Sequence, residues 1–145
     1  MIWNPFGRRK RKTMSDEQKI AFADIIARSL KLQLVIVGES TMDSQAGGPK
    51  RIAIGYVYGC VDAMLRTKGW DMTDFDIGVP ITFQVIRRVW PGKEREYFDF
   101  LVEHLSDPIV GAGMMHGGQQ YIDALKPENS VNVPMGLARY ILTEV

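Results

Sequence analysis

Two histidines and a run of glycines are the residues of this sequence best suited to chemistry. The imidazole of histidine changes charge near neutral pH, and neighbouring glycines leave space for a ligand beside it. His116 directly precedes Gly117 and Gly118. Together with His104 and the polar loop at 38–48, these residues form a candidate pocket for a small molecule or a metal ion. The alternative at both positions is a partly buried histidine with an ordinary hydrogen bond.

The glycine run itself has part of the pattern of a dinucleotide-binding loop. The stretch DPIVGAGMMHGGQQ, residues 107–120, places Gly111 and Gly113 at the first two glycines of G-x-G-x-x-G. His116 occupies the third position, and too few apolar residues precede the glycines to form a buried strand. The stretch opens with aspartate and proline, a pair typical of the first turn of a helix. We therefore predict a helix here and no nucleotide-binding loop.

Other motifs with chemical meaning are missing from the sequence. It contains no H-E-x-x-H zinc motif, no E-x-x-H pair of the di-iron bundles and no G-x-S-x-G nucleophile elbow. Cys60 falls in the middle of an expected helix, where cysteine usually acts as a small, unreactive apolar residue. His104 stands near the end of another helix, where a histidine interacts favourably with the helix dipole. We therefore expect no catalytic residue, no metal ion and no cofactor.

The N-terminus carries a cluster of positive charge. Five of the 18 basic residues of the chain are consecutive. They are Arg8, Arg9, Lys10, Arg11 and Lys12. Repulsion between like charges predicts a flexible arm over residues 1–14. This arm could bind nucleic acid or an anionic membrane surface, with Trp3 and Phe6 reaching the lipid headgroups in the second case. A solvated tail is the alternative.

The composition indicates an ordinary globular protein. Of the 145 residues, 46% are hydrophobic and 24% are charged, and this length suits one domain with its own core. No apolar run reaches the roughly 18 residues of a membrane-spanning helix. We find no signal peptide, and a single cysteine fits a reducing compartment. The sequence thus predicts a cytoplasmic protein that is at most peripheral to a membrane.

Helix signals recur along the rest of the chain. Ser15 and Gln18 form a capping box, and apolar residues follow with helical spacing as far as Gly38. Residues 32–37 are rich in β-branched side chains and could form a strand, but no turn signal separates them from the helix. The expected helices are 15–38, 49–68, 80–90, 93–105, 108–125 and 134–143. We predict an all-α single domain at residues 15–145, an irregular bundle of about six helices.

Small residues recur every four positions in the second expected helix. Gly55, Gly59 and Ala63 lie on one face, and this spacing lets another helix approach closely. Gly111 and Gly118, about two turns apart, could make a similar contact in a later helix. An internal helix crossing is the favoured interpretation, and a homodimer interface is the alternative.

These features predict a non-catalytic interaction protein. It would be an adaptor, a regulator, a homo-oligomer or a subunit of a larger assembly, which the basic arm could tether to an anionic surface. The glycine-lined helix faces, the separable arm and the missing catalytic motifs support this prediction. The alternative is a small enzyme, or a protein that binds a small molecule or a metal ion around His116 and His104.

Overall fold

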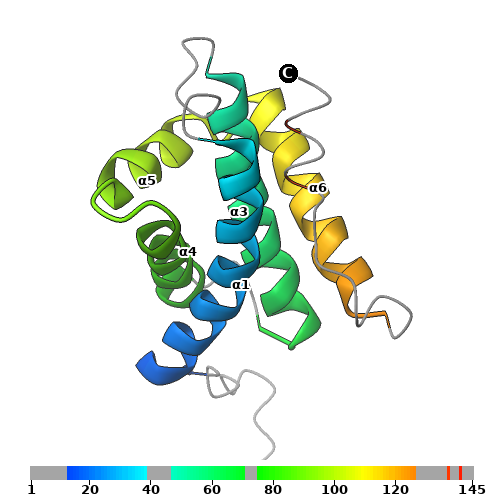
Figure 1. Ribbon diagram of the computed structural model, residues 1–145. Coiled ribbons are helices and arrows are strands. Elements are labelled where there is room, and N and C mark those ends of the chain that lie inside the picture. The colour runs from blue at the N-terminus through cyan, green and yellow to red at the C-terminus, as the bar shows by residue number, and fades with distance from the viewer. Residues whose placement is uncertain (1–12, 39–46, 71–74, 127–136, 138–140, 142–145) are drawn as a thin grey trace, which may run out of the picture.

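The computed structural model describes residues 13–38, 47–70, 75–126, 137 and 141 of the chain. Within them every regular element is a helix, which confirms the all-α fold class, and the helices number five rather than six (Figure 1). They are α1 (Asp16–Val37), α3 (Gly48–Thr67), α4 (Phe75–Val89), α5 (Glu94–Glu103) and α6 (Pro108–Ala124). Of the expected helix at 134–143, only Leu137 and Ile141 are described, and both are helical and fully buried.

The ends of the helices follow the local signals in the sequence. The Ser15 hydroxyl accepts from the Gln18 amide at 3.1 Å, and Gln18 Oε1 accepts from the Ser15 amide at 3.0 Å, so the capping box is confirmed. The side chain of Asp107 accepts from the amide of Ile109 at 2.8 Å, and α6 begins at the proline between them. The helix α1 continues through residues 32–37 without a break, which excludes a strand there.

The start of α4 differs from the prediction. The sequence placed it at Pro80, but the helix begins at Phe75 and the proline lies in its second turn. Proline has no amide hydrogen, so the helix loses the bond to the carbonyl four residues earlier. The additional turn places Ile77 in the core, where it is only 4% exposed. Burial of this side chain favours the longer helix despite the proline, a tertiary effect that the local sequence does not show.

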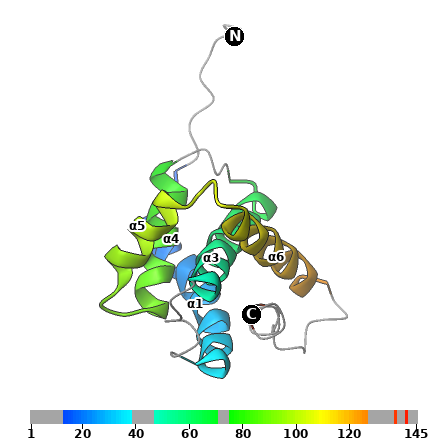
Figure 2. The same ribbon diagram turned by 90° about the horizontal axis from the view of Figure 1, so that it is seen from above.

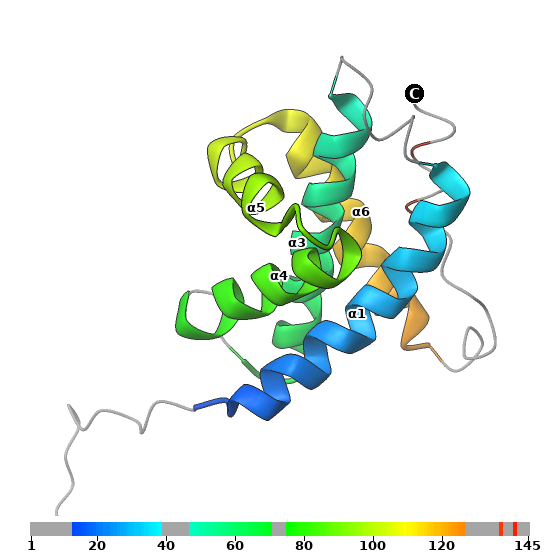
Figure 3. The same ribbon diagram turned by 60° about the vertical axis from the view of Figure 1, so that its left-hand side comes forward.

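The central element of the fold is α3. It packs against α6 on one side and against α4 and α5 on the other, and α1 crosses it (Figures 1 and 2). Figure 3 shows α1 also crossing α4. Nearly all of α3 is buried, including the unbroken run from Ile52 to Val57. A helix enclosed on several sides must be apolar around most of its circumference, as α3 is.

The backbones of α3 and α6 touch where glycines of α3 meet α6. A Cβ atom added to Gly55 would overlap the carbonyl oxygen of Val110, and one added to Gly59 would overlap that of Met114. Ala63, the next small residue of this row, is also buried. The glycine face of α3 therefore forms a helix crossing inside this chain.

The same relation holds in the opposite direction. A Cβ atom on Gly113 would overlap the carbonyl oxygen of Ile52, and one on Gly117 would overlap that of Tyr56. Both helices thus present glycines four residues apart, and each glycine lies on a carbonyl of the facing helix. Four residues are about one helical turn, so the contact repeats along both axes.

The sequence pointed to Gly111 and Gly118 as the contact residues of α6. Gly111 is exposed, and no atom lies within 4 Å of a Cβ built on it, so it takes no part in the crossing. It precedes Gly113 by two residues and therefore lies on the opposite side of the helix. Gly118 does face α3, because its Cβ would lie 3.5 Å from the Gly59 carbonyl oxygen and 3.8 Å from Ala63 Cβ.

A buried glutamine ties a C-terminal residue to the core. Gln33 of α1 is fully buried, and its Oε1 accepts from the amide of Leu137 at 2.7 Å. Burial raises the pKa of the Tyr56 phenol on α3, and hydrogen bonds with the Gln33 side chain and the Leu137 backbone partly offset this rise. Buried polar groups require such partners. These bonds therefore fix Leu137 against α1 and α3.

Most of the predicted basic arm lies outside the described residues. These include Trp3, Phe6 and the basic run 8–12, so surface binding by the arm stays a prediction. Met14, assigned to the end of the arm, is only 6% exposed and packs in the hydrophobic core. Among the described residues, none of the helices has the length and hydrophobicity that crossing a bilayer requires.

Replacing Gly59 or Gly117 with alanine should destabilise the protein. The added methyl group would meet a backbone carbonyl that can move aside only if the helices separate. We expect the free energy of unfolding to fall by about 2 kcal/mol or more. Gly111→Ala is the matched control, because it places alanine in open space on α6. There the higher helix propensity of alanine should raise the free energy of unfolding by roughly 1 kcal/mol.

Urea denaturation followed by circular dichroism measures these differences. A Gly117→Ala protein as stable as the unaltered chain would contradict the backbone contact between α3 and α6.

The Cys60 thiol lies in the same crossing and should be unreactive in the native protein. Its Sγ donates to the Gly117 carbonyl oxygen at 3.4 Å, and burial raises the thiol pKa to about 12. Because the thiolate is the reactive form, a disulfide reagent at about pH 8 should modify the protein only after guanidinium chloride unfolds it. Rapid modification of the native protein would contradict this burial.

The raised pKa also predicts a pH dependence of stability. Above the ordinary cysteine pKa the unfolded chain releases the thiol proton, whereas the folded chain keeps it until about pH 12. The free energy of unfolding should therefore fall with rising pH in this window, and more steeply than for Cys60→Ala. Denaturation curves at several alkaline pH values compare the two slopes, which should differ.

Candidate functional site

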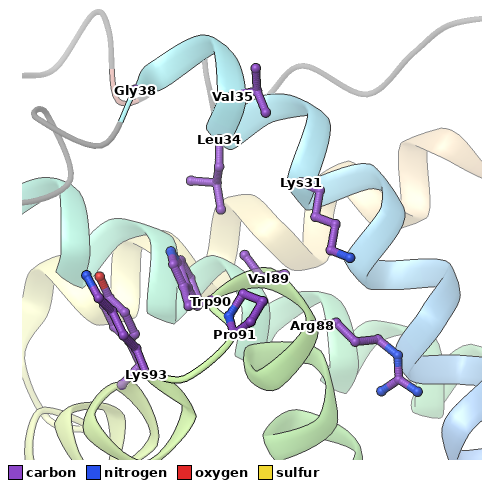
Figure 4. Close-up of a pocket in the computed structure, with 10 residues that line it drawn as sticks. Lys31, Leu34, Val35, Gly38, Arg88, Val89, Trp90, Pro91 and Lys93 are labelled. Atoms are coloured by element: carbon purple, nitrogen blue, oxygen red, sulfur yellow. The ribbon is translucent and has the colours of Figure 1, made fainter.

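A groove opens between α1 and the turn that joins α4 to α5. This α1–α4 groove encloses about 470 Å³, a volume typical of ligand sites. Figure 4 shows α1 on one side and the turn on the other, with Leu34 facing Val89, Trp90 and Pro91. Segments far apart in the sequence thus supply two apolar walls that face each other.

Trp90 is held in place by its neighbours. Its indole stacks on the ring of Tyr97 from α5, with the centroids 4.5 Å apart and the planes at 28°. The Lys50 ammonium of α3 lies 4.5 Å from the centroid of the Tyr97 ring. The amide of Lys93 donates to the Trp90 carbonyl at 3.0 Å and closes the turn, in which Gly92 has a φ of +83°. The groove therefore presents a preformed aromatic surface.

Of the described residues that line the groove, three are basic and none is acidic. Lys31 and Arg88 lie at one end and Lys93 at the other (Figure 4). Arg88 is partly engaged, because Nη1 donates to the Gln84 side chain at 3.0 Å and Nε lies 3.9 Å from Asp24. Neither lysine forms an ion pair with a carboxylate among the described residues. Carboxylates in the described part of the chain therefore leave most of this positive charge uncompensated.

These groups can bind both apolar and charged parts of a ligand. The described residues that line the groove include no histidine, carboxylate, serine or cysteine. The aromatic and aliphatic walls favour the apolar part of a ligand, and the basic groups favour anions beside it. The groove matches the chemistry of an amphipathic anion.

The two histidines lie outside this groove. His104 follows α5, where its Nδ1 is 2.8 Å from the Phe100 carbonyl oxygen and its ring stacks on that of Phe100 at 4.1 Å. His116 is exposed on α6. Neither lines the α1–α4 groove or the two smaller cavities that other described residues form. No group of three or more potential metal ligands comes together within the described residues.

The glycines of the predicted pocket serve a different purpose. Gly117 rests on the backbone of Tyr56, and Gly118 lies close to the backbone of Gly59. The space beside them is thus filled by α3, whereas the adjacent His116 is exposed. Of the loop at 38–48, residues 39–46 lie outside the described residues.

The sequence alone did not reveal the α1–α4 groove, although two signals for it were present. One is the stretch RRVWPGK at residues 87–93, which places an aromatic turn beside basic residues. The other is that α1 carries apolar residues on more than one face: Leu30 is buried, whereas Val35 is 79% exposed. A helix that is apolar on an exposed face has a second surface available for contact.

No known protein family, curated protein or solved structure matches the chain. A function must therefore be inferred from the geometry of the structure.

Proposed function

We propose that the protein is a non-catalytic interaction protein whose α1–α4 groove binds an acidic, amphipathic segment of a partner protein. The observation that carries this proposal is a fixed tryptophan together with three basic residues, and no acidic one, among the described residues of the groove. An apolar side chain of the partner would contact Trp90 and Leu34. Carboxylates on either side of it would approach Lys31 and Lys93.

A protein segment fits this surface better than a small molecule does. Val35 borders the groove, and Leu32, on the same face of α1, is 46% exposed. These side chains continue the apolar surface beyond the groove, further than a ligand of the groove's volume would reach. Continuous exposed apolar surface is typical of protein interfaces.

The charges would contribute mainly to specificity. Lys31 and Lys93 are exposed, so each contact with a carboxylate would be weak and sensitive to salt. Most of the affinity would come from burial of an apolar anchor against Trp90. The basic residues would select acidic partners and reject basic ones.

The basic arm would provide a separate attachment to an anionic surface. This part of the proposal depends only on the sequence of residues 1–12. It does not depend on the proposed role of the groove.

Selection from a random peptide library displayed on phage, with the full-length protein as bait, should enrich one kind of peptide. Aspartate or glutamate should recur beside leucine, phenylalanine or tryptophan, because this pattern complements the groove. Fluorescence anisotropy of a labelled synthetic copy then gives its Kd. Enrichment of peptides without acidic residues would overturn the proposal. Decanoate represents the alternative of a small amphipathic anion, and its binding without that of any peptide would also overturn the proposal.

Reversing the charge of both groove lysines should weaken binding of that peptide. In Lys31→Glu with Lys93→Glu, two attractive contacts become repulsive, and we expect the Kd to rise about tenfold. Lys68→Glu with Lys126→Glu is the matched control. It makes the same change in net charge at exposed lysines outside the groove and should alter the Kd less than about twofold. Equal losses in both double variants would argue against the groove as the binding site.

A further inference from the structure

An apolar row of residues runs along α6 beside its contact with α3. Its members are Gly111, Met115, Gly118 and Ile122, which follow one another at intervals of four, three and four residues. Met115 is 72% exposed, Ile122 is 44% exposed and Gly118 is partly exposed. Figures 1 and 2 show α6 at one side of the bundle, with α3 on its inner side. This α6 row is therefore an apolar helix face that the described part of the chain leaves largely uncovered.

The spacing of the α6 row is that of a helix which packs lengthwise against another helix. Residues at alternating intervals of three and four stay on one line along a helix, and a partner helix inserts its side chains between them. The contact of α6 with α3 uses Gly113 and Gly117 instead. The row therefore has room for a second helix beside α6.

Gly111 makes no contact inside the described chain that would explain a glycine at this position. Glycine inside a helix is unfavourable relative to alanine. At Gly113 and Gly117 the close packing against α3 offsets this cost, whereas no atom lies within 4 Å of a Cβ built on Gly111. A helix of another molecule that packs closely here would offset the cost in the same way.

The side-chain sizes in the row fit those of the same row running in the opposite direction. When two copies of α6 lie antiparallel, Gly111 of each faces Ile122 of the other and Met115 faces Gly118, because both pairs share one midpoint along the helix. Each glycine thus receives a large apolar side chain. A parallel pair would place glycine opposite glycine and leave unfilled space, which close-packed interfaces avoid.

The charge of α6 also suits a second copy of the same helix. From Pro108 to Ile122 the sequence contains no aspartate, glutamate, lysine or arginine. Two identical charged faces would repel each other, whereas these two can meet without burying a charge. The antiparallel orientation places the positive end of each helix dipole beside the negative end of the other. Size and charge therefore both favour self-association.

We propose that the protein forms a symmetric dimer in which the α6 rows of two copies pack antiparallel. The helix has 17 residues and is about 25 Å long, so the contact lies at the low end of specific interfaces, below roughly 1,200 Å². The dimer should therefore dissociate in the micromolar range. It does not rest on the proposed peptide groove, since the described residues of that groove include no member of the row.

Sedimentation equilibrium of the full-length protein from micromolar to millimolar concentration should show monomers in equilibrium with dimers. Met115→Glu should raise the dimer Kd at least about tenfold, because the carboxylate would be buried against Gly118 of the other copy. The monomer should keep its fold, since Met115 is 72% exposed. Circular dichroism at a concentration where both proteins are monomeric should give equal thermal midpoints.

His116→Glu is the matched control. It adds a carboxylate one residue further along α6, at another exposed position. One residue corresponds to about 100° around the helix, which places His116 outside the row. The dimer Kd should change less than about twofold in this variant. Equal weakening in both variants would show an effect of net charge alone and would overturn the role of the row.

Disulfide formation tests the antiparallel orientation. In a mixture of Gly111→Cys and Ile122→Cys proteins, mild oxidation should link one variant to the other rather than either variant to itself. The reason is that only the unlike positions come within the short distance that a disulfide spans. Cys60 is buried and should not compete. A preference for links between like positions would contradict the antiparallel arrangement.

Two further results would overturn the dimer. One is a protein that stays monomeric at millimolar concentration, as expected if α6 contacts a different partner or none. The other is a set of concentration-dependent NMR shifts of methyl groups that leaves out Met115 and Ile122.

Discussion

The backbone contact between α3 and α6 is the constraint on which the rest of the fold depends. Gly55, Gly59, Gly113 and Gly117 each lie against a carbonyl of the facing helix. A Cβ would replace one Cα hydrogen of glycine, so the same geometry directs a C–H group at the carbonyl oxygen, a weak but repeated attraction. Each glycine inside a helix costs about 1 kcal/mol relative to alanine, and close packing along the crossing offsets that cost. With α6 so near, α3 is the buried axis around which α1, α4 and α5 must pack.

The position of α1 follows from this arrangement and places the helix beside the α1–α4 groove and beside a smaller cavity between α1 and α6. The helix packs against α4 and α3, and Gln33 on its buried side holds Leu137. Its C-terminal half borders the α1–α4 groove through Lys31 and Leu34. Its middle borders the smaller cavity through Ile25, which faces α6. One helix therefore uses three surfaces, which explains why its apolar residues do not follow a single stripe.

Local signals in the sequence predicted the elements well and the contacts between them poorly. The capping box at Ser15 and the aspartate before Pro108 act on adjacent backbone groups, so they were sufficient to locate the ends of α1 and α6. Pro80 gave the wrong start for α4, because burial of Ile77 favours another helical turn before the proline. The sequence predicted that Gly111 contacts α3, whereas Gly113 and Gly117 do so. The side of α6 that faces α3 is set by how the two helices pack, which the local sequence does not show. The α1–α4 groove joins segments separated by all of α3, which is why its pattern is not continuous in the sequence.

Two buried groups of the core stay in their protonated, uncharged forms. Burial raises the pKa of the Cys60 thiol and of the Tyr56 phenol, so both stay protonated at physiological pH. Both line the smaller cavity between α1 and α6. The larger groove has the opposite character, with exposed lysines around a fixed aromatic ring. Among the described residues, the smaller cavity is lined by apolar and neutral polar side chains and the groove by basic and aromatic ones.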